Sequence, residues 1–169
     1  MSGLDSRSTP SVASAVYDNP YAGIAQIDDA AQIAGFNRAL ARETEDRELD
    51  LATVTRGVTR FLEGVGAGFY IVAERGDRII GCLMITHEWS DWRDGNMWWI
   101  QSVYVVHDER RRGVFRALYE WIVARAETET DVCGLRLYVE RDNERAQNTY
   151  ASLGMKQEPY WIYEMAIGS

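Results

Sequence analysis

The spacing of apolar and polar residues predicts a chain of alternating strands and helices. Phe69–Ala73 and Ile79–Thr86 are apolar runs of strand length around the tight turn Arg75–Asp77, which predicts a β-hairpin. After a second turn at Asp94–Gly95, the run Met97–Val106 is apolar on both faces. We therefore expect this run to be a central strand that is covered on both sides.

Helical periodicity occurs before and after these strands. One helix is expected to start at Asp28–Asp29, and a second starts at an Asp50 cap and ends where Gly64–Gly68 interrupts the pattern. A third helix runs from Phe115, and a fourth spans Asn143–Leu153.

Three shorter runs complete the pattern: a brief alternation from Tyr21, then Gly134–Val139, and Tyr160–Ile167 after a proline. The resulting order, β-αα-βββ-α-β-α-β, predicts an α/β (α+β) fold in which helices cover both faces of a mixed sheet. Because a helix separates Met97–Val106 from Gly134–Val139, these two strands should be parallel and joined by a right-handed crossover.

Length and composition are those of one soluble domain, because 169 residues are too few for two ordinary ones. Residues 1–20 are rich in Ser and are expected to form a flexible tail, which leaves 21–169 as the folded domain. No stretch approaches the roughly 18 apolar residues of a membrane span, and the N-terminus does not resemble a secretory signal. We therefore expect a cytoplasmic protein without a membrane partner.

The charge and the metal-ligating residues exclude other classes of function. A formal net charge of -8 argues against general nucleic-acid binding, which depends on a broad basic face. The two Cys and two His have no zinc-binding spacing, so no metal site is expected.

Positive charge is nevertheless concentrated at one place, between the central strand and the helix from Phe115. Around Gly113 lie four arginines: Arg110, Arg111, Arg112 and Arg116. A helix N-terminus that follows a buried strand presents free N–H groups and the positive end of the helix dipole. This turn is therefore expected to hold a phosphorylated ligand.

The same turn resembles the coenzyme-binding loop of the GNAT superfamily of acetyl-CoA-dependent N-acetyltransferases. The family pattern is Arg/Gln-x-x-Gly-x-Gly/Ala, in which Arg110 and Gly113 match and Phe115 replaces a small residue. The family uses the backbone N–H at that position, so a Phe115 side chain that points into the core is compatible with it. The resemblance implies that residues 110 to 116, namely Arg110, Arg111, Arg112, Gly113, Val114, Phe115 and Arg116, bind the pyrophosphate of coenzyme A.

A second resemblance lies in the Asn143–Met155 segment, which matches the family helix Asn-x-x-Ala-x-x-x-Tyr-x-x-x-Gly-Phe/Met at every marked position. Asn143 and Tyr150 are seven residues apart and should project from nearly the same helix face. The resemblance covers roughly residues 21 to 167 and implies a mostly antiparallel sheet with one splayed parallel strand pair. It also implies that Asn143 contacts the coenzyme.

The family mechanism is direct attack of an amine on the thioester in a ternary complex. It implies that the backbone of Val103, Tyr104 and Val105 binds the pantetheine arm, with the Val105 N–H as the oxyanion donor. Tyr150 is the expected general acid for the departing thiolate. Many relatives keep a Glu where Gln101 stands, so the base is expected to be Glu88, with Asp91 or a water chain ordered by Gln101 as alternatives.

The acceptor is expected to be a primary amine, most simply of a small cationic or aromatic molecule. Trp89 and Trp92, in a loop-like segment, are candidates to hold it by cation–π contact, and Glu43 or Glu45 to select its charge. The alternatives are acetylation of a protein N-terminus or lysine, and a CoA-binding module without turnover. Dimerisation is common in the family, and a homodimer is compatible with the sequence.

Overall fold

The computed structural model describes residues 21–167, so the expected tail at 1–20 lies outside the described residues. The chain divides into two compact units, one ending at Leu137 and the other beginning at Tyr138.

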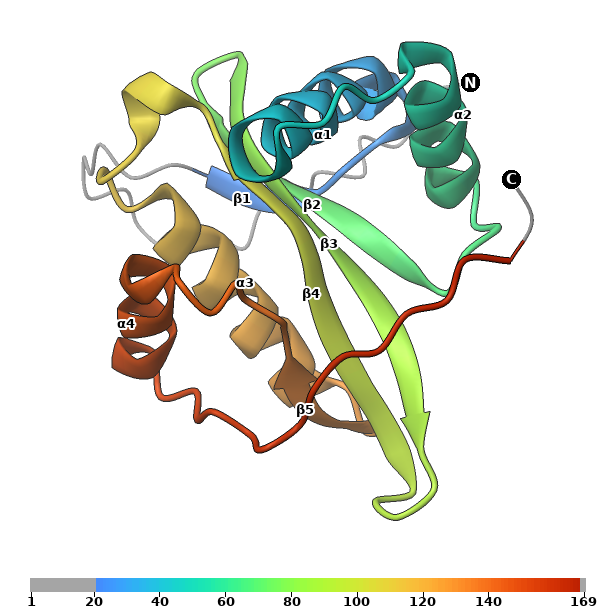
Figure 1. Ribbon diagram of the computed structural model, residues 1–169, viewed down its shortest axis with the longest axis vertical. Helices are drawn as coiled ribbons and strands as arrows, with labels where there is room; N and C mark the ends of the chain where they lie inside the picture. The colour runs from blue at the N-terminus through green and yellow to red at the C-terminus, as the bar shows by residue number, and fades with distance from the viewer. Residues whose placement is uncertain (1–20, 168–169) are drawn as a thin grey trace, which may run out of the picture. The chain divides into compact units, whose positions relative to one another are not determined.

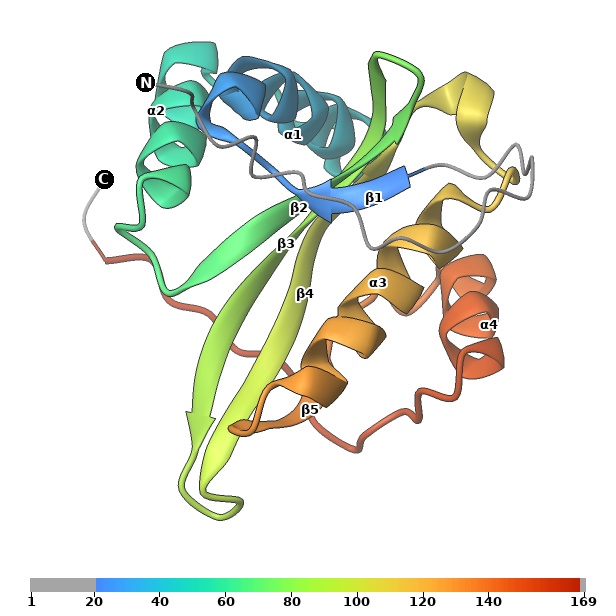
Figure 2. The same cartoon turned by 180° about the vertical axis from the view of Figure 1, so that it is seen from behind.

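The first unit is a five-stranded sheet with helices on both faces. Its elements are β1 (Tyr21–Ile24), the 3-10 turn η1 (Ile27–Asp29), α1 (Ala30–Glu45), α2 (Leu51–Leu62), β2 (Gly68–Arg75), β3 (Arg78–Ser90), β4 (Gly95–Val105), the 3-10 turn η2 (His107–Glu109), α3 (Val114–Thr128) and β5 (Val132–Arg136). The sheet order is β1-β2-β3-β4-β5, in which neighbours are antiparallel except for the parallel pair β4–β5. The α1 and α2 helices cover one face and α3 covers the other (Figures 1 and 2).

A hydrophobic core fills each face of this sheet. On the α1 and α2 side, Ile33, Val58 and Cys82 belong to one buried cluster. On the other side, Leu118 and Ile122 of α3 are fully buried. The sheet is therefore covered on both faces, as the doubly apolar pattern of β4 predicts.

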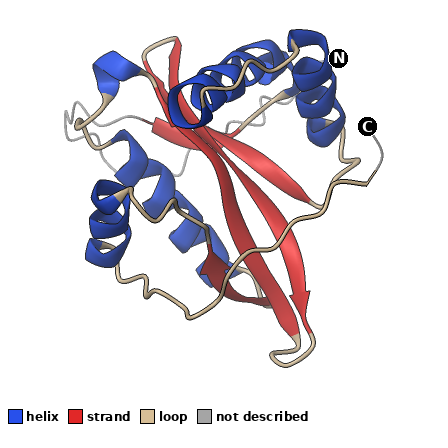
Figure 3. Cartoon of the chain, viewed as in Figure 1, coloured by secondary structure: helices blue, strands red, loops and turns tan. Residues whose placement is uncertain are grey.

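The second unit contains α4 (Glu144–Ser152) and the segment that follows it. The prediction of a closing strand at Tyr160–Ile167 is wrong, because residues 156–167 form a loop in the structure (Figure 3). Apolar strand-forming residues fit a pleated surface only where a partner strand supplies one, and the local pattern does not encode that partner. The other predicted elements are present in the predicted order, with ends shifted by a few residues.

Local sequence explains where several elements begin and end. The Asp50 carboxylate accepts a hydrogen bond of 2.7 Å from the Thr53 N–H and caps α2, as predicted. At the start of β2, Gly68 has φ +148, and a Cβ there would lie 1.9 Å from the Ile85 carbonyl oxygen. Only glycine therefore allows β2 and β3 to approach each other at this point.

We predict that Gly68→Ala lowers the free energy of unfolding by roughly 2–4 kcal/mol, because it adds both backbone strain and a clash. Urea unfolding followed by circular dichroism measures this loss. Gly57→Ala is the matched control, because Gly57 is exposed in α2 with no atom within 4 Å of an added Cβ. That change should raise stability by about 0.5–1 kcal/mol. Equal stabilities of the two variants would contradict the close approach of β2 and β3.

Candidate active site

The β4 strand pairs with its two neighbours over different lengths. Its pairing with β3 extends from Gly95 to Val105, whereas β5 pairs only with Asn96–Trp99. Beyond Trp99, the edge of β4 that faces away from β3 has no strand partner among residues 21–167. The parallel pair is therefore splayed, as predicted, and it leaves backbone groups of β4 available to a ligand.

A β-bulge changes the direction of this unpaired edge of β4. Ser102 and Val103 together oppose Leu83 of β3, and Ser102 has a φ of +49, which is uncommon for a residue other than glycine. After the bulge, the Val106 N–H donates a 3.0 Å hydrogen bond to the β3 carbonyl of Ile80. Because N–H groups alternate in direction along a strand, the N–H of Val105 points away from β3, toward the unpaired side.

The chain then turns through η2 into α3, and Gly113 occupies the N-cap of that helix with φ +80. The first helical hydrogen bond is donated by the Ala117 N–H to the Gly113 carbonyl at 2.9 Å. The N–H groups of Val114, Phe115 and Arg116 precede that bond and face the helix N-terminus. Gly113 has no side chain to cap them, and a Cβ there would meet no protein atom within 4 Å. The turn therefore has the geometry of an anion cradle.

The ring of Phe115 packs beside another aromatic residue of α3. The side chain is half-buried, and its ring centroid lies 6.1 Å from that of Tyr119 on the same helix. The expectation that this side chain points into the core and leaves only the Phe115 backbone to a ligand stays a prediction.

Acidic residues hold two of the four arginines of the turn. The Arg110 Nε donates to the Val105 carbonyl at 2.9 Å, and its Nη2 lies 2.5 Å from the Glu43 carboxylate. Arg112 forms an ion pair of 3.3 Å with Glu109. Much of the positive charge that the sequence concentrates here is therefore balanced by protein carboxylates.

The other two arginines are more exposed. Arg116 lies at 4.0 Å from Glu120 on the surface of α3, a contact worth little energy. Arg111 is exposed and has φ +64, a left-handed conformation that costs about 1 kcal/mol for a residue with a side chain.

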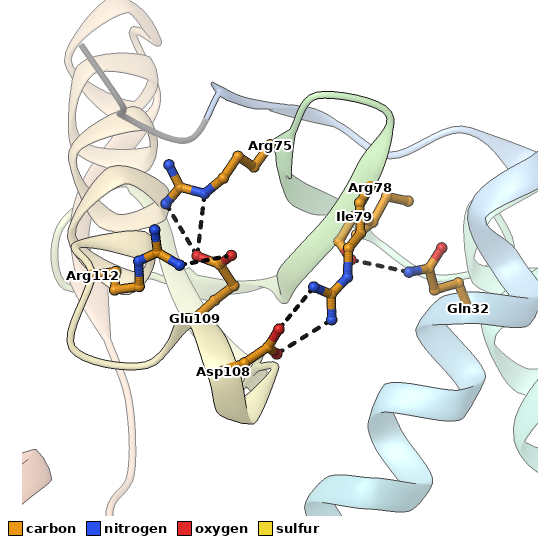
Figure 4. Close-up of polar contacts among 7 residues, drawn as sticks. All are labelled: Gln32, Arg75, Arg78, Ile79, Asp108, Glu109 and Arg112. Atoms are coloured by element: carbon orange, nitrogen blue, oxygen red, sulfur yellow. Dashed lines mark hydrogen bonds and ion pairs between the residues drawn. The ribbon is translucent and has the colours of Figure 1, made fainter.

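Residues at the end of the β2–β3 hairpin form ion pairs with residues at the start of this turn (Figure 4). Glu109 is 5% exposed and pairs with Arg75 of β2 at 3.1 Å in addition to Arg112. The neighbouring Asp108 pairs with Arg78 at 2.9 Å, and this hydrogen bond lowers the pKa of the Asp108 carboxyl.

Glu43, expected at the acceptor site, lies beside Tyr104 and Arg110. The Tyr104 hydroxyl donates to the Glu43 carboxylate at 3.0 Å. Burial opposes ionisation of Glu43, but the hydrogen bonds from Arg110 and Tyr104 outweigh it and hold the Glu43 pKa below its usual value. Burial, reinforced by the Glu43 carboxylate, raises the pKa of Tyr104.

Glu88 of β3, the expected base, is bound by one residue of β4 and one of β5. Its carboxylate accepts a hydrogen bond from the Trp99 indole N–H and pairs with Arg136 of β5 at 3.0 Å. The Arg136 guanidinium also lies 5.5 Å from the centre of the Trp99 ring. Trp99 precedes Val105 by six residues, so Glu88 is anchored about 20 Å along the strand from the Val105 N–H.

Gln101, between these two points, donates a hydrogen bond from its side-chain amide to the Thr86 hydroxyl. Because Gln101 and Trp99 are two residues apart on β4, their side chains project from the same face. The structure thus places polar groups of β3 and β4 along one line between Glu88 and the bulge.

Trp89 and Trp92 lie at the far end of the β3–β4 hairpin, which extends beyond the other strands of the sheet (Figure 1). They are 58% and 89% exposed. Trp89 pairs with Asn96, eight residues before Tyr104. Because Glu43 contacts Tyr104, the positions of Trp89 and Glu43 along β4 are about 26 Å apart. The structure does not bring these predicted acceptor residues together.

The second unit carries Asn143 and Tyr150. Asn143 is the N-cap of α4, and its Oδ1 accepts a 3.0 Å hydrogen bond from the Ala146 N–H. The helix ends at Ser152, Gly154 beyond it has φ +88, and the Met155 N–H donates to the Tyr150 carbonyl at 3.1 Å. Burial raises the pKa of Tyr150.

Sequence reasoning missed Arg136, Arg75 and Glu109. The role of Arg136 depends on the register of β5 against β4, and that of Arg75 on where the hairpin meets η2, and no local pattern reports either. Glu109 did leave a signal, since an acidic residue directly precedes the arginines of the turn.

Within residues 21–167, no helix has the length and apolar character needed to cross a membrane. In the same range, no three His, Cys, Asp or Glu residues are grouped so that they could hold a metal ion.

Known proteins resemble this chain over most of its length. The model of the Acetyltransferase (GNAT) family matches residues 33–155. A crystal structure of a "possible acetyltransferase" from Clostridium difficile 630 is 41% identical with a TM-score of 0.82, and the match covers 89% of this chain and 99% of that one. No curated protein matches the chain.

More distant structures share the fold alone. The ribosomal-protein-alanine N-acetyltransferase from Brucella melitensis biovar Abortus 2308 is 17% identical with a TM-score of 0.71, over 88% of this chain and 99% of that one. A GCN5-related N-acetyltransferase from Ralstonia eutropha JMP134 is 20% identical with a TM-score of 0.65, over 86% and 98% of the two chains.

Proposed function

Because the chain belongs to the GNAT acetyltransferase family, we propose that it transfers the acetyl group of acetyl-CoA to a primary amine. The observation that carries this proposal is the continuity of one strand: the unpaired edge of β4 leads within eight residues from Val105 to the open N-terminus at Gly113. A thioester arm and a pyrophosphate are joined in coenzyme A, and these two features offer one binding surface for each. We place the reaction in the cytoplasm, where Cys82 and Cys133 would remain thiols.

In this proposal, the N–H groups of Val114, Phe115 and Arg116 bind the pyrophosphate at the helix N-terminus. Arg111 and Arg116 add positive charge, since Arg110 and Arg112 already hold protein carboxylates. The backbone of Val103, Tyr104 and Val105 binds the pantetheine arm. Asn143 is assigned to the coenzyme by its place in the second motif.

The chemistry forms a C–N bond and breaks the C–S bond of the thioester. The amine nitrogen attacks the carbonyl carbon, and the Val105 N–H stabilises the negative charge that develops on the oxygen. Tyr150, assigned from its place in the Asn143–Met155 motif, gives its proton to the departing thiolate. Its raised pKa keeps the phenol protonated at neutral pH.

The proton of the attacking ammonium must reach a base. Glu88 is anchored too far from Val105 to contact an amine that attacks a thioester there. Asp91, in the turn beyond β3, lies farther still. We therefore propose a water chain ordered by Gln101 and Thr86, with the Glu88 carboxylate as its final proton acceptor.

For the acceptor we propose a small cationic amine, selected by Glu43. Of the predicted acceptor residues, Glu43 is the one joined through Arg110 to Val105, where the thioester would lie. Small amines that reach Glu43 do not reach Trp92. An extended acceptor, such as a protein N-terminus, is the second candidate, because it alone could contact both Glu43 and the exposed tryptophans.

An acceptor panel tests the proposal. With acetyl-CoA as donor, we expect diamines and aromatic amines to release one thiol for each amine acetylated, with higher kcat/KM than a peptide that begins with alanine. Thiol release is read against a protein blank, because Cys133 is exposed and reacts with thiol reagents. Tight binding of acetyl-CoA without turnover of any amine would refute the enzymatic function. A kcat/KM for the peptide that exceeds those of the small amines, and that Trp92→Ala lowers, would support the second candidate.

Gly113→Ala should raise the KM for acetyl-CoA by about tenfold, because the new methyl group enters the cradle and strains its backbone. Gly64→Ala is the matched control, since Gly64 has φ +85 and equally open surroundings after α2. Both variants should lose about 1 kcal/mol of stability, but Gly64→Ala should keep the wild-type KM. Steady-state kinetics and urea unfolding separate these effects, and an unchanged KM in Gly113→Ala would remove the turn from the donor site.

Tyr150→Phe should lower kcat by about a hundredfold or more and leave the affinity for acetyl-CoA unchanged, because only the proton donor is lost. Burial raises the pKa of Tyr150 above its usual value of about 10, so the wild-type kcat should not fall between pH 7 and 9 through loss of this acid. Rate profiles and isothermal titration of both proteins measure the two quantities. A fall in affinity with unchanged kcat would assign Tyr150 to binding instead.

A further inference from the structure

Glu109 is a buried carboxylate that joins two separate segments of the first unit. It lies in η2 and is 5% exposed, with Arg75 on one side and Arg112 on the other (Figure 4). Arg75 ends β2, a strand whose residues Ile71 and Val72 are almost fully buried. The contact therefore ties the turn before α3 to a rigid part of the sheet.

A purely stabilising role is a weak explanation for this cluster. Removing a carboxylate from water costs several kcal/mol, and apolar residues of similar volume usually stabilise a fold as well as a buried ion pair does. What a buried ion pair supplies in addition is a fixed geometry, because each partner tolerates few arrangements. The position of Glu109 suggests what that geometry serves.

The turn that Glu109 holds is strained. Arg111 and Gly113 both have positive φ, a conformation that is strained in Arg111 because this residue has a side chain. Glu109 and Arg112 flank Arg111 in sequence, and their ion pair closes the chain around it. A strained backbone persists only where its surroundings fix it, and this contact does so directly before the Gly113 N-cap.

We propose that Glu109 is a positioning residue for the donor site: through Arg75 and Arg112 it fixes the turn whose backbone N–H groups receive the pyrophosphate. This inference rests on the proposed function. It also assigns the Arg112 guanidinium to the turn rather than to the ligand. Recognition of the pyrophosphate then depends on preorganised N–H groups and on Arg111 and Arg116.

Kinetics with two acetyl donors distinguish a role of Glu109 in positioning the turn from general damage to the protein. Acetyl-CoA carries the pyrophosphate, whereas S-acetylpantetheine has the same thioester and arm without it. Glu109→Gln should raise the KM for acetyl-CoA by about tenfold with kcat unchanged, and should leave kcat/KM for S-acetylpantetheine at the wild-type value. The acceptor is whichever amine the wild-type protein acetylates.

Asp108→Asn is the matched control. Asp108 contacts the same hairpin through Arg78, but both side chains are more than half exposed, so this pair holds the turn weakly. The KM for acetyl-CoA should stay within about twofold of the wild-type value in this variant. An equal effect of Asp108→Asn and Glu109→Gln would overturn the proposal.

Arg75→Lys provides a milder test, should Glu109→Gln fail to fold. It retains the charge but loses the two-pronged contact of Arg75 with Glu109, so its KM for acetyl-CoA should rise in the same direction. Equal losses with both donors, or no change with either, would refute the positioning role. Failure of the wild-type protein to use acetyl-CoA would instead refute the proposed function.

Discussion

The incomplete pairing of β4 is the constraint on which the candidate site depends. A strand in the middle of a sheet normally satisfies its backbone groups on both edges, but β5 pairs with β4 only up to Trp99. The remaining edge must find another partner, and the bulge at Ser102 turns that edge relative to the first half of the strand. Because the strand leads through η2 into α3, the free edge and the open helix N-terminus are fixed relative to each other by one short stretch of chain.

Protein carboxylates balance part of the positive charge around the turn, which the run of arginines in the sequence does not reveal. The run of arginines indicates a local concentration of positive charge, yet Arg110 holds Glu43 and Arg112 holds Glu109. A ligand at this turn would therefore meet chiefly backbone N–H groups, which are oriented by the helix and cost no side-chain entropy. Under this proposal, an acidic protein needs no basic face to bind an anion.

Most of the fold was predictable because it is local. The Asp50 cap, the hairpin turn before β3 and the doubly apolar β4 each follow from residues that are neighbours in sequence. The Gly113 turn was predictable for the same reason, since its conformation depends on consecutive residues. The Tyr160–Ile167 strand was not, because a strand requires a distant partner, and the pairing of Glu88 with Arg136 likewise depends on register between strands. The catalytic and substrate-binding assignments stay predictions.

The same distinction explains why the acceptor is harder to identify than the donor. In the donor site that we propose, the backbone from Val103 to Arg116 is one continuous segment, so a short motif describes that part of the site. On the acceptor side that we propose, Glu43 of α1 and Glu88 of β3 are held by ion pairs with Arg110 and Arg136 respectively. Along β4 these pairs are well separated: the Glu43 pair lies near Tyr104 and the Glu88 pair near Trp99. Since a small amine spans only a fraction of that distance, the size of the acceptor decides which of these residues it meets. In this proposal the spacing of the pairs along the strand determines which acceptors reach both of them, and no motif in the sequence records that spacing.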